Sequence, residues 1–258
     1  MSALAKYARA LARGGLCVGL DPEPSRLPAA VGGDLLQFLR AIIDATVDLA
    51  GAYKLNAAFF EAQGAAGWQL MEQLRRAVPA DTLLILDGKR GDIASSNGAY
   101  ARAAFDALAV DAVTVHPYLG LEPLAPFTER ADRMTFILCA TSEGRLLQTL
   151  RLASGQPVYL WVAAQVAALQ RPHCGLVVGA TAPAELAAVR AVAPGLPLLV
   201  PGVGAQGGGW PAGAALVNVS RSILYASSGP DFAAAARGKA QDLLAPRLDL
   251  EPATEARP

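Results

Sequence analysis

The sequence predicts an α/β protein, a single (β/α)₈ barrel with an N-terminal capping helix. Short apolar runs that end in polar or glycine-rich turns recur eight times along the chain, and alanine- and leucine-rich stretches with helical spacing lie between them. The length of 258 residues suits eight such units in one closed barrel. An open, doubly wound sheet is the alternative topology for the same alternation.

The eight apolar runs are the expected strands, and the stretches between them are the expected helices. The strands are predicted at Leu16–Leu20, Ala52–Leu55, Leu83–Leu86, Ala112–Val115, Thr135–Leu138, Leu176–Val178, Leu198–Val200 and Leu216–Val219. Helices are expected, among other places, at Asp34–Leu49, Ala66–Ala77, Ser96–Leu108 and Val158–Leu169.

The two ends of the chain differ from the repeating part. The first thirteen residues form an alanine-rich stretch with spaced basic residues, and they lack the continuous apolar segment of a secretory signal, so a capping helix is expected. We expect the barrel domain to span residues 1–244. Residues 245–258 contain three prolines and little apolar periodicity, which predicts a disordered tail.

Composition narrows the classes of function. Hydrophobic residues make up 53% and charged residues 17%, and 22 basic side chains balance 22 acidic ones, so nucleic-acid or membrane-surface binding has no electrostatic support. No apolar run reaches the roughly 18 residues of a membrane span. Cys17, Cys139 and Cys174 are isolated and odd in number, which favours reduced, buried thiols in the cytoplasm over a disulfide framework or a zinc site.

The run Asp87-Gly-Lys89-Arg-Gly-Asp92 directly follows the expected strand at Leu83–Leu86. Side chains at i and i+2 share one face of a strand, so Asp87 and Lys89 should point the same way, with Asp92 close enough to share a small site. At an effective dielectric near 20, a carboxylate about 4 Å from an ammonium favours the charged form by roughly 4 kcal/mol. Lys89 therefore suits a proton donor better than a Schiff-base nucleophile. The competing interpretation is a solvated ion-pair cluster on a turn, worth roughly 0 to 1 kcal/mol.

Residues at the other strand ends add binding functions, because barrel enzymes place their chemistry where strands end. Asp21 and Lys54 follow or end the first two strands and could bind ribose hydroxyls, or could simply form a salt bridge beside the acidic cluster. The glycine-rich segment Gly202–Gly209 follows the seventh strand and Arg221 the eighth, a combination that favours phosphate binding over a mobile surface loop.

Three further positions carry weaker signals. Ser142, after the fifth strand, could hydrogen-bond a planar polar ring. His116 and His173 are too few and too separated for a metal site or a catalytic triad, and His116 is interpreted as a structural hydrogen-bonding residue. Magnesium held by Asp87 and Asp92 is an alternative, since hard cations choose carboxylates, although the lysine between them competes for the same charge.

Six further motifs span essentially all of the barrel. They are Gly19-Leu-Asp21-Pro, Lys54-Leu-Asn56-Ala-Ala-Phe-Phe-Glu, Thr114-Val-His-Pro-Tyr-Leu-Gly120, Val178-Gly-Ala-Thr181, Pro201-Gly-Val-Gly-Ala-Gln-Gly-Gly208 and Ser220-Arg221. Together with Asp-x-Lys-x-x-Asp at the end of the third strand, this ordered set resembles the orotidine 5′-phosphate decarboxylase family, and the segment after the fourth strand resembles its bacterial, type 2-like branch. The Asp-x-Lys-x-x-Asp run alone is shared with related sugar-phosphate barrels.

The resemblance implies decarboxylation of orotidine 5′-monophosphate to uridine 5′-monophosphate, the last step of de novo pyrimidine biosynthesis, without a metal or an organic cofactor. Lys89 would protonate C6 of the pyrimidine as carbon dioxide leaves, with Asp87 beside the departing carboxylate. Lys54 and Asp21 would contact the ribose.

The resemblance also implies a homodimer with shared active sites and a set of substrate contacts. The residues expected to reach the neighbouring subunit's site are Asp92, Ile93 and Ser96. Ser142 would read the amide edge of the pyrimidine, while Gln206 and Arg221 would hold the 5′-phosphate. Two alternatives stay open: a magnesium-dependent sugar-phosphate decarboxylase or aldolase of the same barrel group, and a non-catalytic phosphometabolite-binding barrel that uses the same glycine loop.

Overall fold

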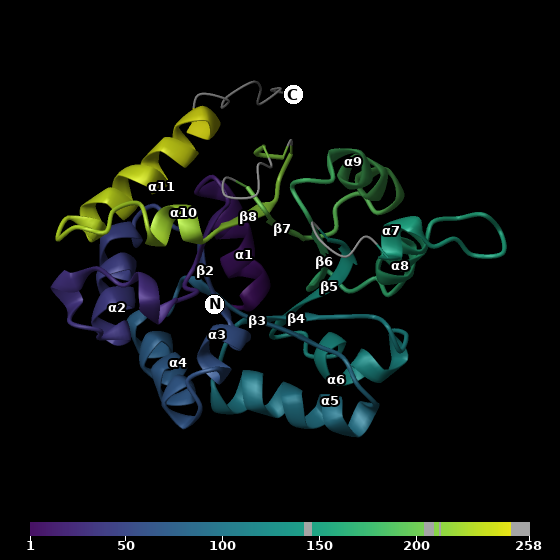
Figure 1. Ribbon diagram of the computed structural model, residues 1–258. Coiled ribbons are helices and arrows are strands. Elements are labelled where there is room, and N and C mark those ends of the chain that lie inside the picture. The colour runs from purple at the N-terminus through teal and green to yellow at the C-terminus, as the bar shows by residue number, and fades with distance from the viewer. Residues whose placement is uncertain (142–145, 204–208, 212, 249–258) are drawn as a thin grey trace.

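The computed structural model describes residues 1–141, 146–203, 209–211 and 213–248. Eight parallel strands pair in sequence order, and β8 pairs with β1, so the predicted closed (β/α)₈ barrel is confirmed (Figure 1). The strands are β1 (Leu16–Gly19), β2 (Ala52–Asn56), β3 (Leu83–Arg90), β4 (Ala112–Val115), β5 (Met134–Ala140), β6 (Cys174–Val178), β7 (Leu198–Pro201) and β8 (Leu216–Val219).

Helices surround the barrel and cover the outward faces of its strands (Figure 1). They are α1 (Ala3–Ala12), α2 (Leu35–Thr46), α3 (Ala57–Glu61), α4 (Ala65–Ala77), α5 (Ala94–Ala101), α6 (Ala125–Thr128), α7 (Leu146–Thr149), α8 (Val158–Ala168), α9 (Pro183–Val192), α10 (Arg221–Leu224) and α11 (Phe232–Leu248). In α2, Asp34 caps the first turn by accepting the amide of Gln37 at 2.9 Å, and the apolar face of the helix is fully buried.

The barrel interior is apolar at its base and charged at its mouth. Successive inward side chains lie two residues apart along a strand. On β3 they are Leu83, Ile85 and then Asp87, and on β2 they are Ala52 and then Lys54. The strands therefore fill the lower layers with hydrocarbon and deliver ionisable groups at the carboxyl ends.

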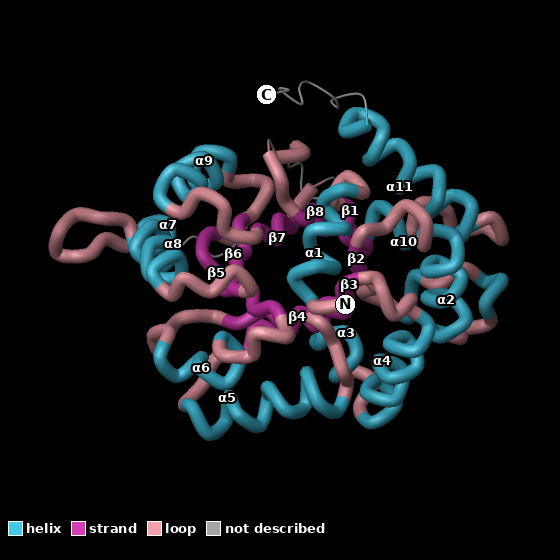
Figure 2. The backbone as a smooth tube through the Cα atoms, turned by 180° about the vertical axis from the view of Figure 1, so that it is seen from behind, coloured by secondary structure: helices cyan, strands magenta, loops and turns pink. Residues whose placement is uncertain are grey.

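The predicted N-terminal helix α1 lies across the base of the barrel, as Figure 2 shows from behind. The Lys6 ammonium forms a 2.6 Å ion pair with Asp111, and both side chains are buried. The Tyr7 hydroxyl accepts the amide of Leu198 at 2.9 Å, at the first residue of β7. These contacts join α1 to the starts of the strands.

Several predicted boundaries differ from those in the structure. Strand β3 continues to Arg90 rather than ending at Leu86, because the ladder with β4 resumes after a bulge and Arg90 pairs with Val115. The helix expected from Ser96 begins at Ala94 and passes into a π-helical segment over residues 102–107. Helix α11 extends to Leu248, into the segment for which a tail is predicted; residues 249–258 lie outside the described part.

The three cysteines are unpaired and buried, as predicted. Burial raises the pKa of the Cys17 thiol to about 12, which keeps it protonated and inert. In the described residues, no helix has the length and apolar character that crossing a membrane requires.

Candidate active site

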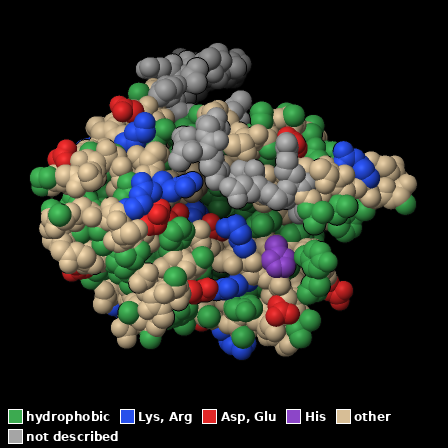
Figure 3. All heavy atoms as spheres, viewed as in Figure 1, with side chains coloured by type: hydrophobic (Ala, Val, Ile, Leu, Met, Phe, Trp, Pro, Cys, Tyr) green, Lys and Arg blue, Asp and Glu red, His purple; other side chains and the backbone are tan. Residues whose placement is uncertain are grey.

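The candidate site lies at the mouth of the barrel, where the carboxyl ends of β1, β2, β3 and β4 converge. Viewed from the side of Figure 1, the surface is hollowed over the barrel, and Lys, Arg, Asp and Glu side chains gather around the hollow (Figure 3). The structure brings together Asp21, Lys54, Asp87 and Lys89, which the sequence placed at three separate strand ends.

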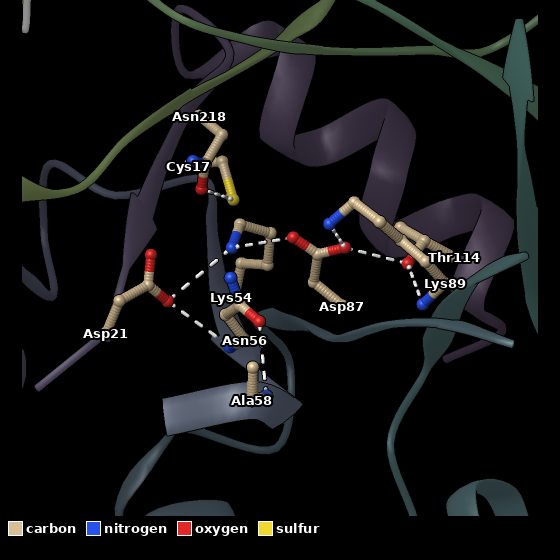
Figure 4. Close-up of polar contacts among 9 residues, drawn as sticks. All are labelled: Cys17, Asp21, Lys54, Asn56, Ala58, Asp87, Lys89, Thr114 and Asn218. Atoms are coloured by element: carbon tan, nitrogen blue, oxygen red, sulfur yellow. Dashed lines mark hydrogen bonds and ion pairs between the residues drawn. The ribbon is translucent and has the colours of Figure 1, made fainter. Parts of the chain in front are cut away.

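These four side chains form a row of alternating charge (Figure 4). Lys54 Nζ lies 3.5 Å from Asp21 Oδ1 and 3.1 Å from Asp87 Oδ2. Lys89 Nζ donates to the other oxygen of Asp87, Oδ1, at 2.7 Å. Asp21 Oδ1 also accepts the amide of Asn56 at 3.2 Å, which fixes the outer end of the row. Each buried charge thus has a partner of opposite sign.

Burial and the attraction between opposite charges shift the pKa values of the row in opposite directions. Burial alone would raise the pKa of Asp87, but the ammonium groups of Lys54 and Lys89 outweigh it and hold that pKa below its usual range. Burial alone would lower the pKa of Lys54, but the carboxylates of Asp21 and Asp87 outweigh it and hold that pKa above its usual range. Both groups are therefore charged at neutral pH.

Lys89 differs from the rest of the row in exposure and backbone. Its side chain is 46% exposed, whereas that of Lys54 is 3% exposed. Its φ of +45° is left-handed, which is uncommon for a residue with a side chain, and it lies in the bulge of β3. The ammonium of Lys89 therefore reaches from the buried carboxylate of Asp87 towards the open mouth.

Asp92 does not join the row within this chain, and its predicted role in the site stays a prediction. Within the described residues it forms no ion pair with Lys89. Its backbone amide donates to Asn97 Oδ1 at 3.0 Å, and Asn97 Nδ2 returns a bond to its carbonyl at 2.6 Å. At Gly91, the residue before Asp92, an added Cβ would lie 2.6 Å from the His116 ring, so only glycine fits.

The remaining predicted residues are dispersed or lie outside the description. Ile93 is 60% exposed, and Ser96 is partly exposed on α5. Arg221 is exposed at the first position of α10, directly beyond β8. Ser142 and Gln206 lie outside the described residues. His116 has the structural hydrogen bonding that was expected, since its Nδ1 accepts the amide of Tyr118 at 3.4 Å.

Two residues that sequence reasoning missed hold the segment from Asp87 to Asp92 in place. Thr114 on β4 bonds both Asp87 and the backbone of Lys89, and the buried Asn97 also donates to the Pro123 carbonyl at 2.7 Å. The period of two was the available signal for Thr114, because it places this hydroxyl inside the barrel two residues after Ala112. Asn97 carried no comparable signal.

The donor set of the mouth suits ammonium groups better than a metal ion. Both oxygens of Asp87 are occupied by lysines, and Lys54 lies between the two carboxylates where a cation would bind. Among the residues that the structure describes, no group of three or more His, Cys, Asp and Glu side chains is arranged to hold a metal.

Comparison with known proteins shows the family of the chain. A profile of the family described as orotidine 5′-phosphate decarboxylase / HUMPS matches residues 14–237. The chain belongs to this family. Members that it resembles include the orotidine 5′-phosphate decarboxylase of Herpetosiphon aurantiacus, 51% identical over 92% of this chain and 94% of that protein. The orotidine 5′-phosphate decarboxylase of Roseiflexus castenholzii is 53% identical over 88% of this chain and 90% of that protein.

Solved structures of the family share the fold. The OMP decarboxylase of Leishmania donovani superposes with a TM-score of 0.82 at 40% sequence identity, over 96% of this chain and all of that one. The family membership thus rests on sequence and structure alike.

Proposed function

We propose that this chain decarboxylates orotidine 5′-monophosphate to uridine 5′-monophosphate, with the Lys89 ammonium as the proton donor to C6. The observation that carries the proposal is the alternating row Asp21, Lys54, Asp87 and Lys89 at the mouth of the barrel. Relatives about half identical over nearly the whole chain bear the name of this activity.

The chemistry follows from a fixed cation beside a leaving carboxylate. The bond between C6 and the carboxyl carbon breaks, carbon dioxide departs, and the electron pair stays on C6. An ammonium aimed at this carbon stabilises the developing negative charge, and its transferred proton completes the C6–H bond. The neutral amine of Lys89 then takes a proton from water. Lys89 suits this role because its side chain is half exposed while its carboxylate partner is buried.

The other members of the row fix the geometry. Asp87 would lie beside the departing carboxylate, and the buried Lys54 would hold Asp87 in place while it and Asp21 contact the ribose. The exposed guanidinium of Arg221, together with Gln206, would hold the 5′-phosphate, and Ser142 would read the pyrimidine. Binding energy from the phosphate can then be used for alignment at the remote C6.

We also infer a homodimer with shared active sites. Asp92 forms no ion pair with Lys89 of its own chain within the described residues; its Oδ1 accepts the Ile93 amide at 2.7 Å, and the carboxylate keeps acceptor capacity for a group from a neighbouring subunit. Large apolar side chains are exposed on the segments that follow β3 and β4, with Ile93 at 60%, Tyr118 at 81% and Leu119 at 50%. A partner that covers these side chains would bring Asp92, Ile93 and Ser96 towards its own site. The buried free thiols support a reducing, cytoplasmic compartment.

The test of the reaction is loss of orotidine 5′-monophosphate absorbance with purified protein, with and without EDTA. We expect turnover that resists EDTA. Turnover of sugar phosphates that requires added magnesium, with none of the nucleotide, would support the metal-dependent alternative. Nucleotide or sugar-phosphate binding without any turnover would support the non-catalytic barrel.

The test of the shared site is complementation between two inactive chains, Lys89→Ala and Asp92→Ala. In a hybrid dimer one of the two sites receives an intact Lys89 and an intact Asp92. Random exchange makes half of the dimers hybrid, so about one quarter of wild-type turnover should return. Subunit exchange is verified separately with differently tagged chains. No recovery after verified exchange would contradict the shared site.

A further inference from the structure

The backbone of β3 is irregular where the catalytic lysine lies. The register between β3 and β4 shifts between Leu86 and Arg90, so the regular ladder does not continue through Lys89. Lys89 has a φ of +45°, and such a conformation persists only where the surroundings hold it. The direction of the Lys89 side chain therefore depends on what fixes this bulge.

Where the ladder is interrupted, the Thr114 hydroxyl on β4 contacts both Asp87 and Lys89 (Figure 4). Its Oγ1 accepts the backbone amide of Lys89 at 3.0 Å and donates to Asp87 Oδ1 at 2.8 Å. A hydroxyl has one proton to give, so the two bonds fix its rotor in one direction. Thr114 is 1% exposed, so water does not replace either bond easily.

Two oxygen atoms, Asp87 Oδ1 and Thr114 Oγ1, thus link the Asp87 carboxylate to Lys89. Asp87 Oδ1 receives both the Thr114 hydroxyl and the Lys89 ammonium, the latter at 2.7 Å. Thr114 Oγ1 bonds the backbone from which that same ammonium extends. The hydrogen bonds therefore form a closed ring. It runs from the Asp87 carboxylate through the Thr114 hydroxyl to the Lys89 backbone, and back to the carboxylate through the Lys89 side chain.

We propose that Thr114 is a positioning residue for the decarboxylation, holding the Asp87 carboxylate and the bulged Lys89 backbone in the geometry that aims the ammonium at C6. This role rests on the proposed function. Thr114 acts through Asp87 and Lys89 and forms no bond in the reaction itself.

Thr114→Val tests the role, because valine keeps the shape and removes the oxygen. We expect kcat to fall roughly 10- to 100-fold, as misplacement of a catalytic group by about 1 Å does. KM should stay close to the wild-type value, since the proposed ribose and phosphate contacts lie on Asp21, Lys54, Gln206 and Arg221. Thr114→Ser retains the hydroxyl and should restore most of kcat.

A matched control removes another buried threonine hydroxyl. Thr135 on the neighbouring strand β5 is fully buried, and its Oγ1 has no hydrogen-bond partner among the described residues. Thr135→Val should leave kcat and KM unchanged. Amide hydrogen exchange adds a structural readout: the Lys89 amide should be protected in the wild type and in Thr114→Ser, and should exchange faster in Thr114→Val.

The possible results separate this inference from the reaction on which it rests. An active wild type with a Thr114→Val variant of unchanged kcat would overturn the positioning role alone. A Thr114→Val defect that Thr114→Ser does not relieve, or that Thr135→Val reproduces, would also overturn it. A wild type that does not turn over orotidine 5′-monophosphate would overturn the proposed function, even with the Lys89 amide protected.

Discussion

The base and the mouth of the barrel each contain a buried ion pair between a lysine and an aspartate, yet the two pairs have different roles. At the base, Lys6 and Asp111 lie 2.6 Å apart, and each side chain is 5% exposed. At the mouth, Lys54 and Asp87 lie 3.1 Å apart, with side chains 3% and 11% exposed. The base pair is sealed beneath α1, whereas the mouth pair continues to the half-exposed Lys89. The two ion pairs therefore differ in whether a ligand can reach them. Only the pair at the mouth is in a position to take part in chemistry.

The largest expected effect is a loss of turnover when the charged row at the mouth of the barrel is changed. Asp87→Asn removes the carboxylate that contacts both Lys54 and Lys89, so the two ammonium groups lose their shared countercharge. We expect kcat for orotidine 5′-monophosphate to fall on the order of 10²- to 10⁴-fold. Glu61→Gln is the control, because this nearby carboxylate pairs with Arg90 and not with the lysines. Equal losses in both variants would contradict a specific role for Asp87.

The second effect is on stability at the base. Lys6→Met leaves the Asp111 charge buried and without its ion-pair partner, which should lower the free energy of unfolding by about 3–5 kcal/mol. The kcat of the folded variant should match the wild type, because α1 lies at the opposite end of the barrel from the candidate site. Denaturant unfolding and steady-state kinetics measure the two quantities. A kcat as low as that of Asp87→Asn would show that the two ends are not independent.

A smaller effect is expected at the same end from Tyr7→Phe. The Tyr7 hydroxyl accepts the Leu198 amide at 2.9 Å, so its removal leaves a buried N–H without an acceptor. The free energy of unfolding should fall by about 1–3 kcal/mol, with kcat unchanged. A loss larger than that of Lys6→Met would assign the anchoring of α1 to the hydroxyl rather than to the ion pair.

The smallest effect is a change in how stability responds to acid. The pKa of Asp87 is held below its usual value, so its contribution is present above the unfolded pKa of about 3.9 and is lost as pH falls through the folded value. Between pH 5 and pH 3, unfolding free energy should therefore fall less in Asp87→Asn than in the wild type. The pKa of Lys54 is raised, so its contribution is lost only as pH rises above about 10.4. Identical acid slopes would contradict the charge assigned to Asp87.

Most of the fold could be predicted from the sequence because the patterns that indicate each strand are local. Each strand is a short apolar run between turns, and each of the eight predicted strands is present. The period of two also correctly placed Asp87 and Lys89 on one side of β3, where their side chains meet at 2.7 Å. The predicted strand end was wrong because pairing with β4 resumes at Arg90, and pairing between strands leaves no mark on one strand's own sequence.

The site was less readable because part of it depends on contacts between distant segments. Thr114 reaches Lys89 only through the bulge, and no pattern in either strand specifies that register shift. The backbone of Asp92 is held by Asn97, and the preceding Gly91 approaches His116 closely. Such contacts follow from three-dimensional packing, whereas the charged row itself followed from where the strands end.

The most direct test of the central claim is the turnover of Lys89→Ala measured beside its binding of uridine 5′-monophosphate. Lys239→Ala, a substitution of a partly exposed lysine on α11, is the matched control. We predict that Lys89→Ala abolishes decarboxylation while it still binds the nucleotide, and that Lys239→Ala retains both. Turnover by Lys89→Ala at the wild-type rate would contradict the assignment of the proton donor.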